Sequence, residues 1–325
     1  MTTIEPLAGL GLTRVIFQAP IGSIASPELA AAVSNAGGLG HLACTWRNPE
    51  QLADLFLEMR TLTDRPFGAN FVIGFPIDDR LSAALDHGVR AISFFWGDAS
   101  PYLARVKAAG AIAIQVVGSI AEAKLAAETG FDLIVAQGRE AGGHVRGSLG
   151  TMALVPQVVD AVAPLPVLAA GGIADRRGVT AAMALGAAGV WIGTRFLAAR
   201  EANIHPEYQA RVIASSGDDT LYSELFDIGW PNSALRTLKN STTHLWEAAG
   251  RPVSPDRPGE GEVVARRADG SEIPRYHFGS PTRDIAEGAE AMALYVGEAV
   301  GLVHHTTAAA AIVEELGGAP RALSE

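Results

Sequence analysis

The chain has almost no cysteine, little lysine and no excess of positive charge. Its single cysteine, Cys44, leaves no partner for a disulfide bond within the chain. Acidic residues outnumber basic ones by 35 to 25, which gives the 325 residues a net charge of −10. Nucleic-acid-binding surfaces need clustered positive charge, so we expect no nucleic-acid partner.

Long hydrophobic runs are missing as well. The longest uncharged apolar stretch, residues 178–194, is shorter than the roughly 20 residues of a membrane-spanning helix, and glycines divide it. The first residues, MTTIEPLAGLGLTR, lack the basic segment and the apolar run of a signal peptide. We therefore expect a cytoplasmic protein without membrane contact.

Residues 14 to about 200 instead alternate regularly between two kinds of segment. Eight short apolar runs are separated by alanine- and leucine-rich segments with helical spacing. The runs are RVIFQAP, GLGHLAC, FGANFVIG, AISFFWG, AIAIQVV, DLIVAQG, PVLAAGG and GVWIGTRF. Apolar strands that alternate with helices are typical of parallel sheets covered on both faces, and eight β/α units close a (β/α)8 TIM barrel. A doubly wound sheet is the alternative, but APIGSIAS after the first run is not its GxGxxG loop.

Helix-start and helix-stop signals agree with this α/β reading. Ser26 precedes Pro27, which is the pattern of an N-terminal cap followed by proline in the first turn. Glycine is common just after a helix ends. We expect helix ends at Gly37-Gly38, Gly110, Gly130 and Gly186.

The pattern changes after Arg200. Residues 205–280 are richer in proline, tryptophan, asparagine and charge, and we expect a mostly helical cap or excursion over the barrel mouth. Residues 281–325 begin with a segment of helical spacing, 282–303, and we expect helices that pack back on the barrel. The barrel itself, with its functional site, takes residues 1–204.

Glycine loops follow the seventh and eighth apolar runs. Gly171 and Gly172 lie one β/α unit before Gly193 and Thr194, so both loops rise at the same end of the barrel. Bare glycine amides and a threonine hydroxyl at a helix start can cradle a phosphate, and TIM barrels bind phosphate at these two loops. The alternative is that the glycines only form tight turns. Their occurrence at both expected places favours phosphate.

Two other chemistries are poorly supported. A Schiff-base enzyme needs a lysine at the end of a strand, whereas the only lysines, Lys107, Lys124 and Lys239, fall in predicted helices and in the cap. We expect no metal site, because HExxH and CxxC are absent and the adjacent His304 and His305 suit a helix end.

Other reactive or aromatic residues have simpler interpretations. Cys44 ends the second apolar run and is expected to be a small buried residue rather than a nucleophile. Trp96, Tyr102 and Trp230 are expected to be core or cap aromatics.

His144 is the remaining catalytic candidate. It follows the sixth run in a loop where Gly142 and Gly143 could let a planar ligand lie against the backbone. An imidazole can accept a proton or bind an anion near neutral pH. An isolated loop histidine often only packs or caps, but its place among glycines at a barrel mouth favours a catalytic role.

Five segments of the chain together resemble the nitronate monooxygenase family, formerly called 2-nitropropane dioxygenases, which are FMN-containing TIM barrels. The segments are APIGSIASPELAAAVSNAGGLG, GANFVIGFP, HGVRAISFFWGD, QGREAGGHVRG and VLAAGGIADRRGVTAAMALGAAGVWIGTRFL. They run in the family's order within residues 14–200. Two positions depart from the family pattern: Ile21 stands where methionine is common, and Val145 separates His144 from the Arg-Gly pair that usually follows directly.

The resemblance implies an FMN whose phosphate lies on the loops of Gly171, Gly172, Gly193 and Thr194. It also implies flavin contacts at Asn70, Gln137, Gly142 and Gly143 and at the backbone of Ala19, Pro20 and Ile21. His144 matches the active-site histidine, which acts as a base toward a nitroalkane or holds the nitronate anion. The implied reaction is oxidation of an alkyl nitronate by O2, through one-electron transfer to the flavin, which gives a carbonyl compound and nitrite. The expected partners are small molecules, with a homodimer as the candidate assembly.

Two alternative functions remain open at this point. One is an FMN reductase of the same superfamily that takes hydride from NAD(P)H and reduces an enoyl thioester or a quinone. The other is a flavin-free barrel that binds a phosphorylated metabolite as an isomerase or sensor.

Overall fold

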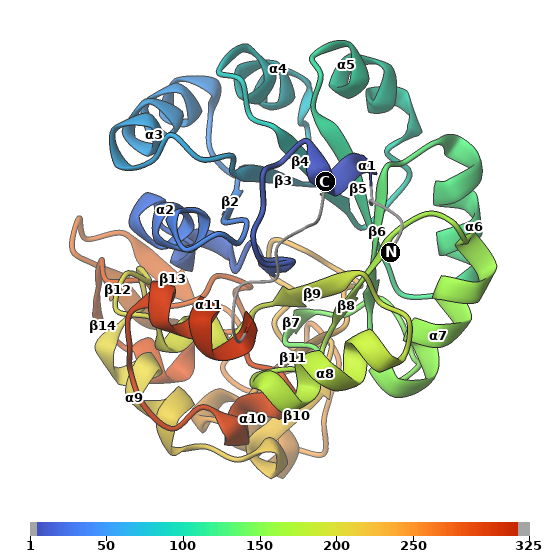
Figure 1. Cartoon of the computed structure of the whole chain (residues 1–325). Coiled ribbons are helices and arrows are strands. Elements are labelled where there is room, and N and C mark those ends of the chain that lie inside the picture. Colours follow the sequence, from blue (N-terminus) through green and yellow to red (C-terminus); the bar gives the residue numbers. More distant parts are fainter. Residues whose placement is uncertain (1–4, 318–325) are drawn as a thin grey trace.

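A computed structural model describes residues 5–317 and shows a (β/α)8 barrel (Figure 1). Its sheet contains eight parallel strands in the order β1-β9-β8-β6-β5-β4-β3-β2. The strands are β1 (Ile16–Gln18), β2 (His41–Ala43), β3 (Gly68–Val72), β4 (Ala91–Phe95), β5 (Ile112–Val117), β6 (Leu133–Gln137), β8 (Val167–Ala170) and β9 (Gly189–Ile192). Each of the eight apolar runs holds one of these strands, so the predicted barrel is confirmed.

Hydrogen bonds between β1 and the residues just before β2 close the barrel. Leu39 donates its N–H to the carbonyl of Ile16 at 2.9 Å and accepts the N–H of Gln18 at 2.9 Å. These bonds form a parallel bridge between Phe17 and Leu39. Each strand therefore has a neighbour on both sides, as a closed barrel requires.

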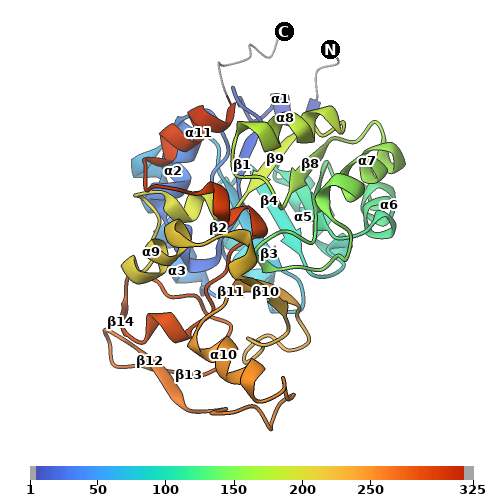
Figure 2. The ribbon, with the colours of Figure 1, turned by 90° about the horizontal axis from the view of Figure 1, so that it is seen from below.

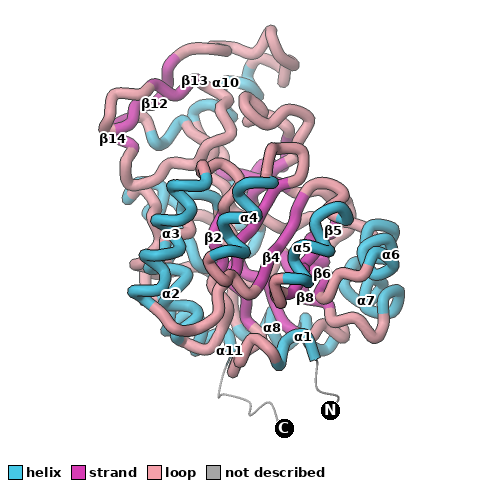
Figure 3. The backbone as a smooth tube through the Cα atoms, turned by 90° about the horizontal axis from the view of Figure 1, so that it is seen from above, coloured by secondary structure: helices cyan, strands magenta, loops and turns pink. Residues whose placement is uncertain are grey.

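Helices form the outer layer of the barrel (Figure 3). They are α2 (Pro27–Asn35), α3 (Pro49–Leu62), α4 (Asp78–Asp86), α5 (Leu103–Ala108), α6 (Ile120–Thr129), α7 (Thr151–Val162) and α8 (Arg176–Ala184). The predicted cap of α2 is present, because the Ser26 hydroxyl accepts the N–H of Leu29 at 3.1 Å. Gly130 takes φ +99° directly after α6, a conformation that costs glycine little. No helix within residues 5–317 is long and apolar enough to cross a membrane.

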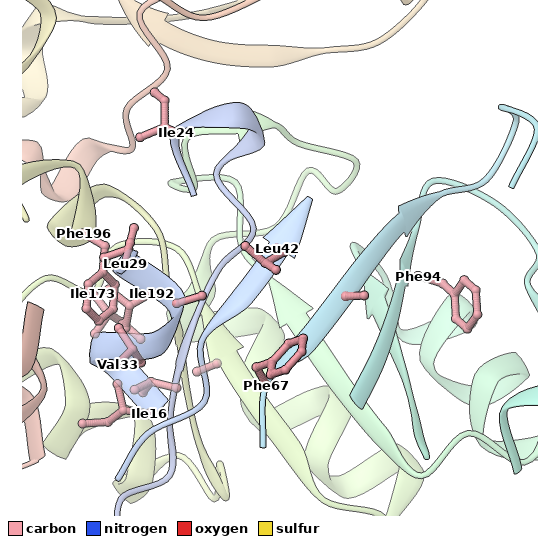
Figure 4. Packing of buried hydrophobic residues seen from close by; sticks show 14 of the residues in the cluster. Ile16, Ile24, Leu29, Val33, Leu42, Phe67, Phe94, Ile173, Ile192 and Phe196 are labelled. Atoms are coloured by element: carbon pink, nitrogen blue, oxygen red, sulfur yellow. The ribbon is translucent and has the colours of Figure 1, made fainter. Parts of the chain in front are cut away.

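Side chains alternate across the barrel wall. Ile16 and Ile192 point outward and pack with Leu29 and Val33 of α2 in the layer between sheet and helices (Figure 4). The next position along each strand points inward, so Phe17 of β1 lies in the barrel interior with residues of β4, β5, β6, β8 and β9. The segment that holds α1 (Glu5–Ala8) covers the amino-terminal end of the barrel, at the top of Figure 2. The interior is therefore filled at that end, and a site can open only at the carboxyl ends of the strands.

The sequence predicts a mostly helical excursion over residues 205–280, but the structure shows a mixture of short helices and strands. It contains α9 (Pro206–Ala214), α10 (Ser241–Ala248), β10 (Thr220–Ser223), β11 (Leu235–Leu238), β12 (Val263–Arg267) and β13 (Glu272–Pro274). Two antiparallel sheets, β10-β11-β7 and β13-β12-β14, frame it with the help of β7 (Gly143–His144) and β14 (Ile285–Glu287). The excursion's own strands are only three to five residues long, too short to show a clear period, and β11 also pairs with the distant β7. Figure 2 shows β12, β13 and α10 at the end of the molecule opposite α1.

Residues 282–303 do not form the continuous helix that their spacing predicts. They contain β14 and two short 3-10 turns, Ala289–Ala291 and Glu298–Leu302. Glycine interrupts the pattern: Gly288 has φ +81°, and a Cβ there would lie 1.9 Å from the carbonyl oxygen of Val264. One later helix, α11 (Ala309–Gly317), does lie against the barrel, beside α2 and α8 (Figure 1). The last part of the predicted C-terminal helices, 318–325, lies outside the described residues.

One titratable side chain is sealed inside the barrel. His41 of β2 is fully buried, and neither ring nitrogen has a hydrogen-bond partner within residues 5–317. Its ring lies 4.6 Å from the ring of Trp191 and fills the space above Gly68, where a Cβ would come within 2.2 Å of Nε2. Burial lowers the pKa of His41 from 6.5 to about 3, so the imidazole is neutral in the folded protein.

This buried imidazole should make the fold sensitive to acid. Below pH 6.5 the unfolded chain takes up a proton on His41 that the folded chain refuses until about pH 3, so stability falls as pH drops through that window. Replacing His41→Leu should reduce the loss of unfolding free energy between pH 7 and pH 4.5 by about 2–3 kcal/mol. Denaturant unfolding at both pH values measures this difference. The control is His244→Leu on the exposed face of α10, and an equal effect of the two substitutions would contradict the prediction.

Candidate active site

A cavity of about 420 Å³ opens at the carboxyl ends of the barrel strands, where the excursion covers the barrel. All twelve site residues proposed from the sequence line it: Ala19, Pro20, Ile21, Asn70, Gln137, Gly142, Gly143, His144, Gly171, Gly172, Gly193 and Thr194. They come from five different β/α units, so the barrel brings together residues up to 175 positions apart, from Ala19 to Thr194. The structure therefore places these residues in one site, and their chemical roles remain to be tested.

The loops after β8 and β9 offer backbone donors to the cavity. Gly171 and Gly172 have φ values of +94° and +71°, which other residues rarely adopt. Within residues 5–317, no protein acceptor takes the amide hydrogens of Gly172, Gly193 or Thr194. The Thr194 hydroxyl oxygen accepts the N–H of Gly297 at 2.8 Å, which leaves its own proton free to donate. These unpaired donors lie at the two loops for which the sequence predicts phosphate binding, and they are the candidate anion cradle.

The two glycines before His144 also meet requirements of the chain itself. A Cβ on Gly142 would lie 2.3 Å from the carbonyl carbon of Val296 and 2.4 Å from the nitrogen of Gly297. The bare backbone at Gly142 is thus required by the chain's own C-terminal segment, although the residue also lines the cavity. Gly143 has φ +74° and open space where its Cβ would be, so its conformation, not crowding, favours glycine.

His144 is held by backbone pairing with the excursion. It lies on β7, which pairs antiparallel with β11, so that His144 stands opposite Leu235. The next residue, Val145, is buried and donates its N–H to the carbonyl of Ala234 at 2.8 Å. On the barrel side, Gln137 Nε2 donates to the carbonyl oxygen of His144 at 3.0 Å. The residue that departs from the family pattern, Val145, therefore anchors the catalytic candidate to the excursion.

The imidazole of His144 is neutral and lacks a polar partner. Its ring stacks on Trp230 with centroids 3.9 Å apart and planes 23° apart, and its Nε2 has no hydrogen-bond partner among the described residues. Burial lowers the pKa of His144 from 6.5 to about 3. A neutral imidazole can donate one hydrogen bond from its N–H and accept one at its other ring nitrogen. With such a low pKa it is a weak base.

Sequence reasoning missed the aromatic side of the cavity. Trp230, expected to be a core or cap aromatic, lines the cavity and stacks on His144. The ring of Trp96 meets the ring of His144 edge-on, with centroids 6.1 Å apart. Trp96 has φ +67°, which is strained for a bulky residue. Trp46, Phe278 and Tyr295 also line the cavity. Large aromatic residues occur throughout the predicted core, cap and C-terminal segments, so the sequence alone could not single these out.

Two smaller observations complete the site. The Glu140 carboxylate lines the cavity and accepts the N–H of Thr151 at 2.8 Å, which caps the start of α7. Cys44 is fully buried, and burial raises the pKa of its thiol to about 12. A thiol with such a pKa is not ionised near neutral pH, in agreement with the predicted packing role.

Comparison with known proteins identifies the family. The family model described as nitronate monooxygenase matches residues 6–76 and 71–318. A Rhodococcus jostii protein named (3aS,4S,5R,7aS)-5-hydroxy-7a-methyl-1-oxo-octahydro-1H-indene-4-carboxyl-CoA dehydrogenase is 38% identical over 74% of this chain and 68% of its own. Nitronate monooxygenase npaC of Metarhizium robertsii is 35% identical over 95% of this chain and 91% of its own.

Solved structures agree with these relatives. FabK from Thermotoga maritima superimposes with a TM-score of 0.81 at 30% identity, covering 97% of this chain and 95% of its own. Nitroalkane oxidase from Streptomyces ansochromogenes superimposes with a TM-score of 0.77 at 27% identity, covering 95% of this chain and 96% of its own. From the family match, the relatives and the shared barrel, the chain is an enzyme that belongs to the nitronate monooxygenase family of flavin-dependent oxidoreductases.

Proposed function

We propose that the protein uses FMN and O2 to oxidise alkyl nitronates to a carbonyl compound and nitrite, and that His144 binds the nitronate. The observation that carries this proposal is the half-buried, neutral imidazole of His144, which lines the same cavity as the anion cradle and whose Nε2 has no hydrogen-bond partner among the described residues. The family match and the likeness to a nitroalkane oxidase support the reaction class.

The cradle fits the phosphate of FMN. The free amides of Gly172, Gly193 and Thr194 are the donors that a phosphate needs, and they lie at the two loops where TIM barrels bind phosphate. The Thr194 hydroxyl adds a donor whose oxygen is already fixed by Gly297. A bound flavin supplies the electron transfer from substrate to O2, chemistry that no side chain of the cavity can perform.

The environment of His144 favours a substrate that arrives as an anion. With its pKa lowered to about 3, the imidazole is a poor base for a neutral nitroalkane. The same neutral ring can donate one N–H to a nitronate oxygen, and in a site of low polarity this bond is strong. Trp230 covers one face of the ring, so a substrate that meets His144 approaches it from the open side of the cavity.

Oxygen uptake by the flavin-loaded protein on addition of propane-2-nitronate, without NAD(P)H, tests the proposal. Uptake with stoichiometric nitrite release is the expected result, and neutral 2-nitropropane should react much more slowly. His144→Asn should keep the flavin content but lower turnover roughly a hundredfold or more, the scale of a lost catalytic group. No uptake, together with rapid bleaching of the flavin by NADH or NADPH, would replace the proposal by the reductase alternative.

Direct titration of His144 tests its charge state. In histidine-labelled protein the His144 imidazole should stay neutral from pH 8 to pH 5, as should that of the buried His41, whereas an ordinary histidine titrates near 6.5. The signal is assigned to His144 by its loss in His144→Asn. A midpoint between pH 6 and pH 7 for that signal would show that His144 is protonated in the working range and would contradict its proposed role.

The phosphate cradle is tested by Thr194→Val. This change removes the hydroxyl at nearly constant volume, and it should weaken FMN binding about tenfold to a hundredfold, as expected for a lost hydrogen bond to a charged group. Released flavin should be FMN rather than FAD by chromatography. Thr180→Val on the exposed face of α8 is the matched control and should leave the FMN dissociation constant unchanged. Equal affinity of both variants would remove Thr194 from the cradle.

A further inference from the structure

Three aromatic residues form a continuous surface on the substrate side of the cavity, here called the aromatic wall: Trp46, Trp230 and Phe278. Their rings contact one another, with centroids 5.8 Å apart for Trp46 and Trp230, 5.4 Å for Trp46 and Phe278, and 6.4 Å for Trp230 and Phe278. Phe75 packs behind them, 5.7 Å from Trp46 and 5.6 Å from Trp230.

The wall is fixed from both the barrel and the excursion. Trp46 follows β2 of the barrel, whereas Trp230 and Phe278 lie on excursion segments whose backbones pair. Ile228 donates its N–H to the carbonyl of Tyr276 at 3.1 Å, and Phe278 donates to the carbonyl of Ile228 at 3.1 Å. The wall is therefore a preformed surface, and its rings need little ordering when a ligand binds.

One part of the wall remains open to solvent. Trp46 is 43% exposed although it lines the cavity, whereas Trp230 is 6% exposed. An exposed indole beside a cavity gains stability when an apolar ligand covers it. Because Trp230 already stacks on His144, a group bound next to that histidine extends along the wall toward Trp46.

The charges around the cavity restrict what that group can be. Among the described residues that line the cavity, Arg267 carries the permanent positive charge, and its guanidinium is already paired with Asp284 at 2.5 Å. His277, also in the lining, has its pKa lowered by burial and then by Arg267, so it is neutral near pH 7. A second anionic group on the substrate would have to compete with Asp284 for Arg267.

We propose that the substrate is a nitronate whose carbon carries an uncharged aromatic or alicyclic ring, and that this ring packs on the aromatic wall. The inference rests on the proposed nitronate chemistry, because it names the substrate class of that same site. Short-chain nitronates leave most of the wall uncovered, and nitronates with an added carboxylate meet an apolar surface.

Binding of carboxylates that are not oxidised tests the wall independently of catalysis. A carboxylate is a planar, two-oxygen anion like a nitronate, so benzoate, propionate and succinate serve as probes. With the flavin-loaded protein, flavin absorbance and tryptophan fluorescence give the dissociation constants. Benzoate should bind at least about tenfold more tightly than propionate, since its ring buries on the order of 60 Å² more apolar surface. Succinate should bind no more tightly than propionate.

Variants assign that preference to the wall. Trp46→Leu and Phe278→Leu should each reduce the benzoate-to-propionate ratio to below about threefold, with flavin content unchanged. The rings that contact His144 are those of Trp96, Trp230 and Tyr295, so neither substitution removes a ring that touches it. Trp246→Leu on α10, away from the cavity lining, is the matched control and should keep the ratio. Equal binding of benzoate and propionate to the wild-type protein, or a ratio that survives both wall variants, would overturn the proposal.

Oxygen uptake then separates the two proposals. If the wall selects the substrate, kcat/KM should be at least about tenfold higher for phenylmethanenitronate than for propane-2-nitronate, and lowest for propionate-3-nitronate. If no nitronate is oxidised but the benzoate preference depends on Trp46, the nitronate chemistry fails and the ring-binding wall stands. If nitronates are oxidised with no preference for the ring, the wall proposal fails and the nitronate chemistry stands.

Discussion

The antiparallel pairing between β7 and β11 is the contact on which the site depends. It is only two residues long on the barrel side, yet it fixes the backbone of His144 opposite Leu235 and continues through the bond from Val145 to Ala234. A loop histidine without this pairing would be free to sample many positions, and its hydrogen-bonding edge could not be aimed at a substrate. The excursion thus does more than cover the barrel mouth, because one of its strands completes the active-site loop.

The same contact decides the charge of His144. Pairing with the excursion brings Trp230 over the imidazole and removes water from it, and this burial lowers the pKa to about 3. His41, deeper in the barrel, is neutral for the same reason, but it is enclosed by Phe17 and Trp191 and does not line the cavity. Two histidines with similarly lowered pKa values therefore differ in their surroundings. His41 packs inside the barrel, whereas His144 lines the cavity and has no hydrogen-bond partner for its Nε2 among the described residues.

The parts of the fold that could be predicted from the sequence are those with a local signal. Parallel barrel strands are buried on both faces, so each appears as a continuous apolar run, and the cap of α2 can be read from Ser26 and Pro27. The glycine loops after β8 and β9 could be placed because strand ends of a barrel meet at one edge. Their meeting in one cavity with His144 follows from topology alone.

The parts that escaped prediction depend on contacts between distant segments. A two-residue strand such as Gly143–His144 has no periodicity, and its partner β11 lies about ninety residues further along the chain. Residues 282–303 have helical spacing, but Gly297 and Glu298 instead bond across to Thr194 and to the carbonyl of Glu140. The close backbone approach at Gly142 is the other side of that contact, which no local pattern reveals.

Buried charge, rather than a large apolar core, organises the outer part of the excursion. The Arg257 guanidinium is 6% exposed and pairs with Asp227 at 2.6 Å and with Glu260 at 2.7 Å, and it lies 4.4 Å from the ring of Tyr276. A buried ion pair adds little net stability compared with apolar packing, but its directional bonds allow few alternative arrangements. Here they join the segment before Trp230 to the segment before Phe278. The position of the aromatic wall therefore depends on a polar cluster outside the cavity.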